Sequence, residues 1–126
     1  MQIPEELRYS SDHEWASRNG KIVRIGITDF AQDALGDVVY VEVPAVGTVV
    51  AAGAGVGEVE STKSVSEIYA PVAGTIVSVN ANLSDSPEAV NADPYGDGWL
   101  CEIELSDEST FDGLLDADGY RSLTEG

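Results

Sequence analysis

The chain has 126 residues, a length at which one domain buries roughly two-thirds of its unfolded surface and two full cores do not fit. Hydrophobic residues make up 43% and charged residues 23%, as in ordinary globular proteins. Asp and Glu number 23 against 6 Lys and Arg, which gives a net charge of −17. Such an acidic surface repels phosphate backbones and anionic lipid, so we expect no binding to nucleic acid or to a membrane surface.

Single copies of cysteine and histidine, Cys101 and His13, limit the chemistry further. One thiol excludes an intrachain disulfide and a thiolate metal site, and one imidazole excludes the common multi-histidine sites. Cys101 lies in an alternating apolar pattern without a cationic partner, which favours a buried structural thiol. No stretch has the roughly 20 apolar residues of a membrane span. Residues 1–6 lack the basic and apolar regions of a secretory signal, so we expect a cytoplasmic protein.

The first third of the chain predicts strands and one short helix. The dipeptide Asn19-Gly20 precedes a β-branched run over 21–27, which is typical of a hairpin. Thr28 is expected to cap a helix over 30–35 that ends at Gly36. The next strand covers 38–43 and is expected to direct alternate valines to one face: Val39, Val41 and Val43.

An internal repeat occupies the middle of the chain. Pro44–Val50 matches Pro71–Val77 at an offset of 27 residues, and the same offset aligns Val56 with Leu83. Two copies are too few for a solenoid. They predict two similar halves about a pseudo-two-fold axis, and hence a mainly β fold: a flattened β-barrel or sandwich of two quasi-symmetric halves, with short N-terminal and C-terminal helices.

The last third changes character. Residues 84–88 resemble a helix start, 91–98 form a turn-rich loop, and 99–105 alternate as a strand. A helical segment is expected over about 106–126, packed on the rest through an apolar stripe. Nothing reads as a linker, so we expect a single domain over 1–126.

A hairpin with a polar tip is predicted between the two repeats. Val59 and Val65 flank a tip that presents Lys63, one of only two lysines, and no Lys or Arg occurs from residue 64 to 120. The tip lacks Asn-Gly and Asp-Gly, so the turn type stays open. In the simplest interpretation, Lys63 is an ordinary surface lysine that keeps the tip soluble. An isolated amine on a tight tip between two related halves instead favours covalent attachment of a carrier group to Lys63.

Four spaced segments carry a resemblance to a known family. Residues 60–64, Glu-Ser-Thr-Lys-Ser, resemble the lipoyl-lysine site of the glycine cleavage system H-protein family. Residues 9–15 end in His-Glu-Trp like the family's N-terminal signature, 25–36 resemble its I-G-I-T-x-x-A-Q-x-x-L-G segment, and 93–100 its late P-Y-x-x-G-W segment. The resemblance covers nearly the whole chain, with the motifs in order.

The resemblance implies a lipoylated shuttle that is not itself an enzyme. Lipoate would be joined to Lys63 as an amide by a lipoate-attaching enzyme. It would receive an aminomethyl group from the glycine decarboxylase (P-protein), deliver it to the aminomethyltransferase (T-protein), and be reoxidised by dihydrolipoyl dehydrogenase (L-protein). The protein would supply presentation, orientation and protection. We expect a monomer that docks these partners through its acidic charge.

A carried amine is cationic, which favours a cleft with acidic groups for the arm. Glu14 is the main candidate because it lies in a family motif, and Asp12 and Glu67 are further candidates. Surface carboxylates without a role are the alternative for all three. Ala34 stands where the family often has a histidine, so no role carries over to that position.

Two other classes of protein remain open. A biotinyl carrier or a 2-oxo acid dehydrogenase lipoyl domain also presents a lysine on a hairpin, but a biotin site usually reads Met-Lys-Met and Lys63 lies between Thr62 and Ser64. An H-like chain that only relays lipoate to other enzymes, or an unmodified acidic interaction module, is the second alternative.

Overall fold

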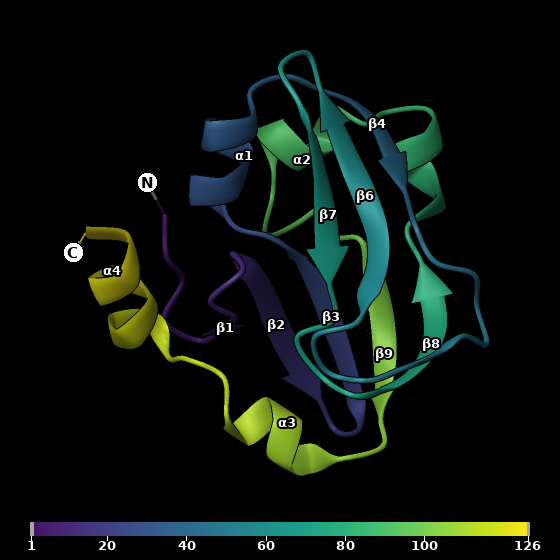
Figure 1. Cartoon of the computed structure of the whole chain (residues 1–126), viewed down its shortest axis with the longest axis vertical. Helices are drawn as coiled ribbons and strands as arrows, with labels where there is room; N and C mark the ends of the chain where they lie inside the picture. The colour runs from purple at the N-terminus through teal and green to yellow at the C-terminus, as the bar shows by residue number, and fades with distance from the viewer. Residues whose placement is uncertain (1, 126) are drawn as a thin grey trace.

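The computed structural model describes residues 2–125, in which nine strands form two antiparallel sheets (Figure 1). The larger sheet has the order β1-β2-β3-β9-β8-β5, with bounds β1 Arg8–Tyr9, β2 Glu14–Asn19, β3 Ile22–Ile27, β9 Cys101–Leu105, β8 Gly74–Val79 and β5 Val49–Val50. The smaller sheet has the order β4-β6-β7, with bounds β4 Val38–Glu42, β6 Gly55–Ser61 and β7 Val65–Tyr69. The helices are α1 Asp29–Leu35, a 3-10 helix Ala81–Ser84, α2 Ala89–Ala92, α3 Glu108–Asp112 and α4 Ala117–Glu125.

The main core lies between the two sheets. Buried aliphatic side chains of both sheets pack together there, among them Val23, Val41, Val59, Ile68 and Ile103. The described strands remain two sheets and do not close into a barrel. The predicted mainly β fold is therefore confirmed in its sandwich form.

The two sequence repeats pair with each other. β5 and β8 run antiparallel, with Val49 opposite Thr75. Shifting that pair by the 27-residue offset gives Ile76 and Thr48, and the Ile76 N–H does donate to the Thr48 carbonyl at 2.8 Å. Each repeat thus supplies the partner of the other, as the predicted two quasi-symmetric halves require.

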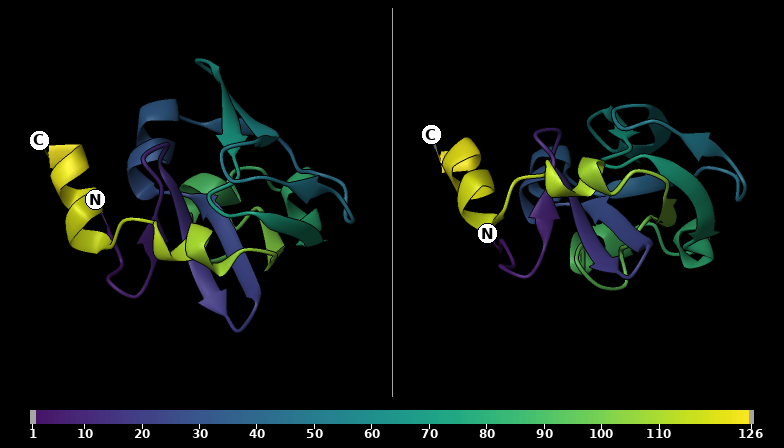
Figure 2. Two further views of the ribbon diagram at one scale, coloured as in Figure 1. Left: turned by 60° about the horizontal axis from the view of Figure 1, so that its bottom comes forward. Right: turned by 90° about the horizontal axis from the view of Figure 1, so that it is seen from below.

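A second, smaller core joins the two ends of the chain. Its buried side chains come from the N-terminal segment, β2 and α4: Leu7, Tyr9, Trp15, Ala117 and Tyr120. The views in Figure 2 place α4 and both ends of the described chain together, at one end of the molecule. This packing brings α4 next to the loop between β1 and β2.

The caps of α1 follow the sequence. The Thr28 hydroxyl accepts a hydrogen bond from the Ala31 N–H, and Gly36 ends the helix with a φ of 83°. The Gly36 N–H donates to the Gln32 carbonyl, which satisfies a group at the helix end. The predicted helix is confirmed, and its position beside β7 makes it part of the site described below.

Two strand details differ from the expectation. Asn19 pairs with Ile22, so the central residues of the β2–β3 turn are Gly20 and Lys21, with Gly20 at the first position where a type II′ turn requires glycine. In β4, a bulge after Val38 changes the alternation, so Val38 is buried and Val39 is exposed.

The C-terminal third is more broken than the sequence indicates. Residue 84 ends a 3-10 helix instead of starting an α-helix, and α2 begins only at Ala89. The segment over 106–125 forms two helices, α3 and α4, because the chain between them is extended: Leu115 exchanges backbone hydrogen bonds with Tyr9. Strand β9 and the burial of Cys101 follow the sequence.

Candidate functional site

The site begins at the turn between β6 and β7, which lies at the top of Figure 1. The Ser61 N–H donates to the Ser64 carbonyl, so Thr62 and Lys63 are the two central residues. Neither has a positive φ, which excludes the type I′ and II′ turns. The Ser61 hydroxyl compensates by accepting hydrogen bonds from the N–H groups of Lys63 and Ser64, both at 3.1 Å. A side-chain oxygen therefore holds the turn that presents Lys63.

The side chain of Lys63 is exposed and leans toward α1. A Cβ built on Gly36 would lie 3.2 Å from Lys63 Cε, and the Thr62 N–H donates to the Asp37 carbonyl at 3.0 Å. Within residues 2–125 no carboxylate forms an ion pair with Lys63. The amine thus sits free at the tip, anchored only through its aliphatic stem.

A cleft of about 310 Å³ starts beside this lysine. It runs between α1 and β7 to the loop between β1 and β2, and it is lined by Asp12, His13, Ile27, Phe30, Ala31, Ala34, Leu35, Ser64, Val65, Ser66, Glu67 and Ile68. From residue 64 to 68 the strand rises about 13 Å. The walls are mainly apolar, with a carboxylate from either side, a composition suited to a long aliphatic arm that ends in a polar group.

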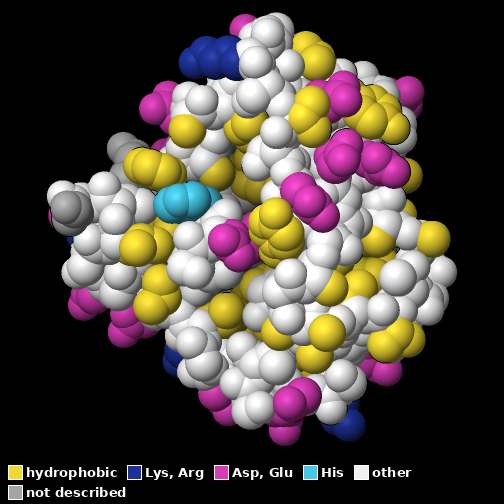
Figure 3. Space-filling model, in the orientation of Figure 1, with side chains coloured by type: hydrophobic (Ala, Val, Ile, Leu, Met, Phe, Trp, Pro, Cys, Tyr) yellow, Lys and Arg dark blue, Asp and Glu magenta, His cyan; other side chains and the backbone are white. Residues whose placement is uncertain are grey.

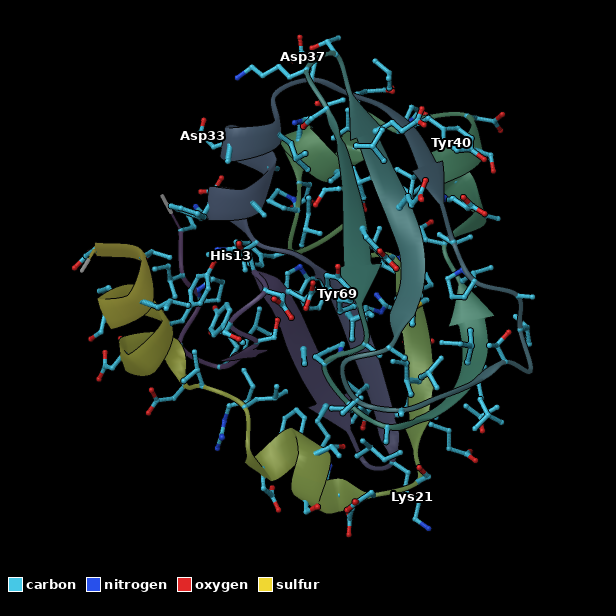
Figure 4. All side chains as sticks on the ribbon, in the orientation of Figure 1. His13, Lys21, Asp33, Asp37, Tyr40 and Tyr69 are labelled. Carbon is cyan, nitrogen blue, oxygen red and sulfur yellow. The ribbon has the colours of Figure 1, made fainter. Side chains whose placement is uncertain are left out.

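The three candidate carboxylates take different positions. Asp12 and Glu67 line the cleft, and the Glu67 side chain lies across Gly55 of β6. Glu14 is only 1% exposed and lies beneath β7, where its Oε2 accepts a hydrogen bond from the Tyr69 N–H at 3.4 Å. Figure 4 labels Tyr69, whose N–H is this donor, and His13, the residue that precedes Glu14. Asp12 and Glu67 are therefore at the cleft surface, and Glu14 is behind it.

Burial controls the ionisation of Glu14. Loss of water raises the pKa of this carboxyl to about 7, although hydrogen bonds from the Ser10 hydroxyl, at 2.5 Å, and from the Tyr69 N–H oppose the shift. Asp12 adds a smaller contribution in the same direction as burial. Glu14 is thus a carboxyl that changes charge near neutral pH, next to a cleft.

Three residues that the sequence did not single out belong to the site. His13 lines the cleft and stacks on Phe30 with a centroid distance of 4.7 Å. Gly36 contacts the Lys63 stem, and Tyr120 contacts His13 from α4. The family motif around His13 marked its segment, but no local pattern links residue 120 to residue 13.

A β-sandwich that presents one lysine on a two-residue turn beside an apolar cleft defines a swinging-arm carrier domain. Comparisons with known proteins narrow this class. The model of the glycine cleavage H-protein family matches residues 7–126. Glycine cleavage system H proteins from Micrococcus luteus and Mycobacterium avium are 62% and 57% identical; the first match covers 97% of both chains, the second 98% of both. The crystal structure of an H protein from Mycobacterium marinum superposes with a TM-score of 0.90 at 42% identity, and the match covers 98% of this chain and 100% of that one.

The chain belongs to the glycine cleavage H-protein family. Members carry covalently attached lipoate and act as the lipoyl shuttle of the glycine cleavage system, so this chain is a carrier component of that system. The apolar cleft that starts next to Lys63, with carboxylates at its surface, fits such an arm. None of the helices between residues 2 and 125 is long and apolar enough to cross a membrane.

Proposed function

We propose that Lys63 is the residue that carries lipoate. The observation that supports this most directly is its geometry: the amine is exposed on a two-residue turn, free of ion pairs among residues 2–125, and adjacent to the cleft that begins at Ser64. Lys21, the other lysine, lies in the β2–β3 turn and lines none of the pockets described. Attached to Lys63, lipoate would supply a disulfide that can accept an aminomethyl group on one sulfur while the S–S bond breaks and the other sulfur becomes a thiol.

The cleft would protect the arm between partners. Apolar side chains of α1 and β7 exclude water from an aliphatic chain. Asp12 and Glu67 would offset the positive charge of a carried amine, and the uncharged surface left by Ala34 gives the arm room along α1. Glu14, behind the cleft, would adjust the local charge by taking up or releasing a proton.

We propose that the chain is a non-catalytic, monomeric, cytoplasmic carrier that forms one domain over residues 1–126. Its partners would be the P-, T- and L-proteins and the lipoate-attaching enzyme. The outer face of the β4-β6-β7 sheet supports docking to basic partner surfaces, because Glu42, Glu58 and Glu67 stand directly opposite one another there. Figure 3 shows acidic side chains gathered over this face. Like charges in such pairs destabilise a sheet, so a partner that neutralises them would bind favourably.

Mass spectrometry tests the assignment of Lys63. Protein from cells supplied with lipoate should show one lipoyl increment on the peptide that contains residue 63. Lys63→Arg should fold normally, lack the increment and fail to support glycine-dependent reduction of NAD by the reconstituted system, while Lys21→Arg should behave as wild type. A biotinyl increment, an unmodified lysine, or full activity of Lys63→Arg would overturn the proposal.

A further inference from the structure

A chain of hydrogen bonds links α4 to the cleft. His13 Nδ1 lies 2.8 Å from the Tyr120 hydroxyl, which lies 2.7 Å from the hydroxyl oxygen of Thr28. Thr28 caps α1 by accepting from the Ala31 N–H at 3.2 Å. Residues far apart in sequence therefore join two parts of the cleft wall, the loop that bears His13 and the start of α1.

The direction of these hydrogen bonds follows from burial. Thr28 and Tyr120 are fully buried, so water is not available to either hydroxyl. Among residues 2–125 the Thr28 hydroxyl contacts only the Ala31 N–H, which is a donor, and the Tyr120 hydroxyl. The Thr28 proton must therefore point to the tyrosine oxygen, because a buried hydroxyl proton without an acceptor is unfavourable. The Tyr120 proton then points to His13 Nδ1.

This direction sets the state of the imidazole. When Nδ1 accepts a hydrogen bond, the neutral ring carries its proton on Nε2. The ionisable groups near the ring are Asp12 and Glu14 on either side of it in sequence, Tyr120 on α4 and Glu67 across the cleft, and the α1 side chains that line the cleft are uncharged. Burial lowers the pKa of His13 and Asp12 opposes this, which agrees with a neutral ring.

The backbone at His13 has an unusual conformation. Its φ is 70°, the only positive value at a non-glycine residue between positions 2 and 125. Glycine would occupy this conformation without strain. A histidine at this position therefore indicates a role for its imidazole side chain. The His13 carbonyl also accepts the Thr28 N–H at 3.1 Å, which ties the loop to the same cap.

We propose that Tyr120 is a positioning residue for the cleft: fixed by Thr28, its hydroxyl holds His13 uncharged, with the proton on Nε2, in the wall that faces the arm. A charged imidazole there would repel a cationic amine, whereas a neutral one leaves the attraction of Asp12 and Glu67 intact. The effect on the carried group rests on the proposed function, but the state of the imidazole does not.

Nitrogen-15 NMR of the unlipoylated protein tests the imidazole directly, because the chain has one histidine. Well above the pKa of His13, long-range correlations should show the proton on Nε2 in wild type and in Thr28→Ser, which keeps the hydroxyl. Tyr120→Phe and Thr28→Val should show both tautomers and a higher pKa of His13. A proton on Nδ1 in wild type, or a Tyr120→Phe spectrum identical to wild type, would overturn the proposal.

Tyr9→Phe is the matched control. Tyr9 stacks on Tyr120 at a centroid distance of 4.7 Å, and its hydroxyl donates a partly buried hydrogen bond to the Pro4 carbonyl. Tyr9→Phe removes that hydrogen bond without changing the chain of hydrogen bonds to His13. In lipoylated, aminomethyl-loaded protein, Tyr120→Phe should lose the carried group to water several-fold faster than wild type, and Tyr9→Phe should not. Equal loss in both variants would mean a merely structural role and contradict the proposal.

If Tyr120→Phe does not fold, the Thr28→Val and Thr28→Ser pair decides the tautomer. If Lys63 does not carry lipoate, the peptide that contains it will lack the lipoyl mass increment, and the NMR result will be unaffected.

Discussion

The aliphatic stem of Lys63 lies against Gly36, the residue that ends α1. A Cβ built on Gly36 would approach Lys63 Cε to 3.2 Å and Cδ to 3.5 Å. Gly36 has φ 83° and ψ −160°, a conformation that is essentially restricted to glycine. The end of the helix and the position of the lysine are therefore coupled at one residue, and the tip of the hairpin is supported from the side.

Replacement of Gly36 by alanine should destabilise the protein and slow lipoate attachment. The backbone conformation alone should lower the free energy of unfolding by about 1–3 kcal/mol, and the new methyl group should displace the Lys63 stem. Denaturant unfolding and the initial rate of lipoylation measure the two effects. Gly113→Ala is the control, because Gly113 also ends a helix but has a φ of −79° and should tolerate alanine. Equal effects of the two variants would contradict the coupling.

Loss of the Ser61 hydroxyl should loosen the turn that presents Lys63. Ser61→Ala removes the acceptor of two N–H groups at the tip. Because these groups are exposed, we expect a loss of only about 0.5–1.5 kcal/mol in the free energy of unfolding. Faster exchange of the Lys63 amide and slower lipoylation should accompany it. Ser64→Ala serves as the control, since its hydroxyl forms no hydrogen bond with another side chain or backbone group in residues 2–125. A Ser61→Ala protein with wild-type amide exchange would refute the role of this hydroxyl.

The raised pKa of Glu14 should make stability fall as pH rises. Between the unfolded value near 4.5 and the folded value of about 7, the folded state binds more protons than the unfolded state, so the free energy of unfolding decreases with pH. The contribution is fully present below about pH 4.5, declines by on the order of 3 kcal/mol through this window, and is constant above about pH 7.

Unfolding of wild type and Glu14→Gln across this range measures the contribution, because the other carboxylates are common to both proteins. The difference between the two curves should decrease from pH 4.5 to 7 and then stay level. A difference that is flat, or that increases with pH, would show that burial does not raise the pKa of Glu14 in the folded protein.

The row of glutamates on the β4-β6-β7 sheet should lower the stability of the protein and strengthen its docking to a basic partner. Glu58 stands between Glu42 and Glu67, so Glu58→Gln removes two like-charge pairs and should raise the free energy of unfolding by about 0.2–1 kcal/mol. The same change should weaken binding to the glycine decarboxylase P-protein several-fold at low salt and reduce its dependence on salt.

Asp112→Asn tests whether net charge alone is responsible, since it changes the charge equally on α3, away from this sheet. It should leave binding unchanged. If both variants weaken binding to the same extent, the docking surface does not lie on the β4-β6-β7 sheet. A wild-type affinity that does not respond to salt would exclude electrostatic docking altogether.

Local sequence was sufficient for those parts of the molecule that short-range forces determine. The caps of α1 at Thr28 and Gly36, the hairpin that exposes Lys63, and the 27-residue repeat are all readable because they depend on neighbouring residues or on a direct comparison of two segments. Motif resemblance added the family and a candidate attachment site. Where a bulge intervened, as after Val38, alternation assigned Val39 to the wrong face.

The acidic composition with its two lysines singled out Lys63 from the sequence alone, but only the tertiary structure decided what surrounds it. The burial of Glu14, the contact of Gly36 with the lysine stem, and the hydrogen bonds from Tyr120 to His13 and Thr28 join residues 27 to 107 positions apart. No local pattern encodes such contacts, because they arise when two sheets and a C-terminal helix pack around shared cores. The sequence therefore determined which residue is the candidate for attachment of the arm, and the packing decided how the cleft beside it is shaped and charged.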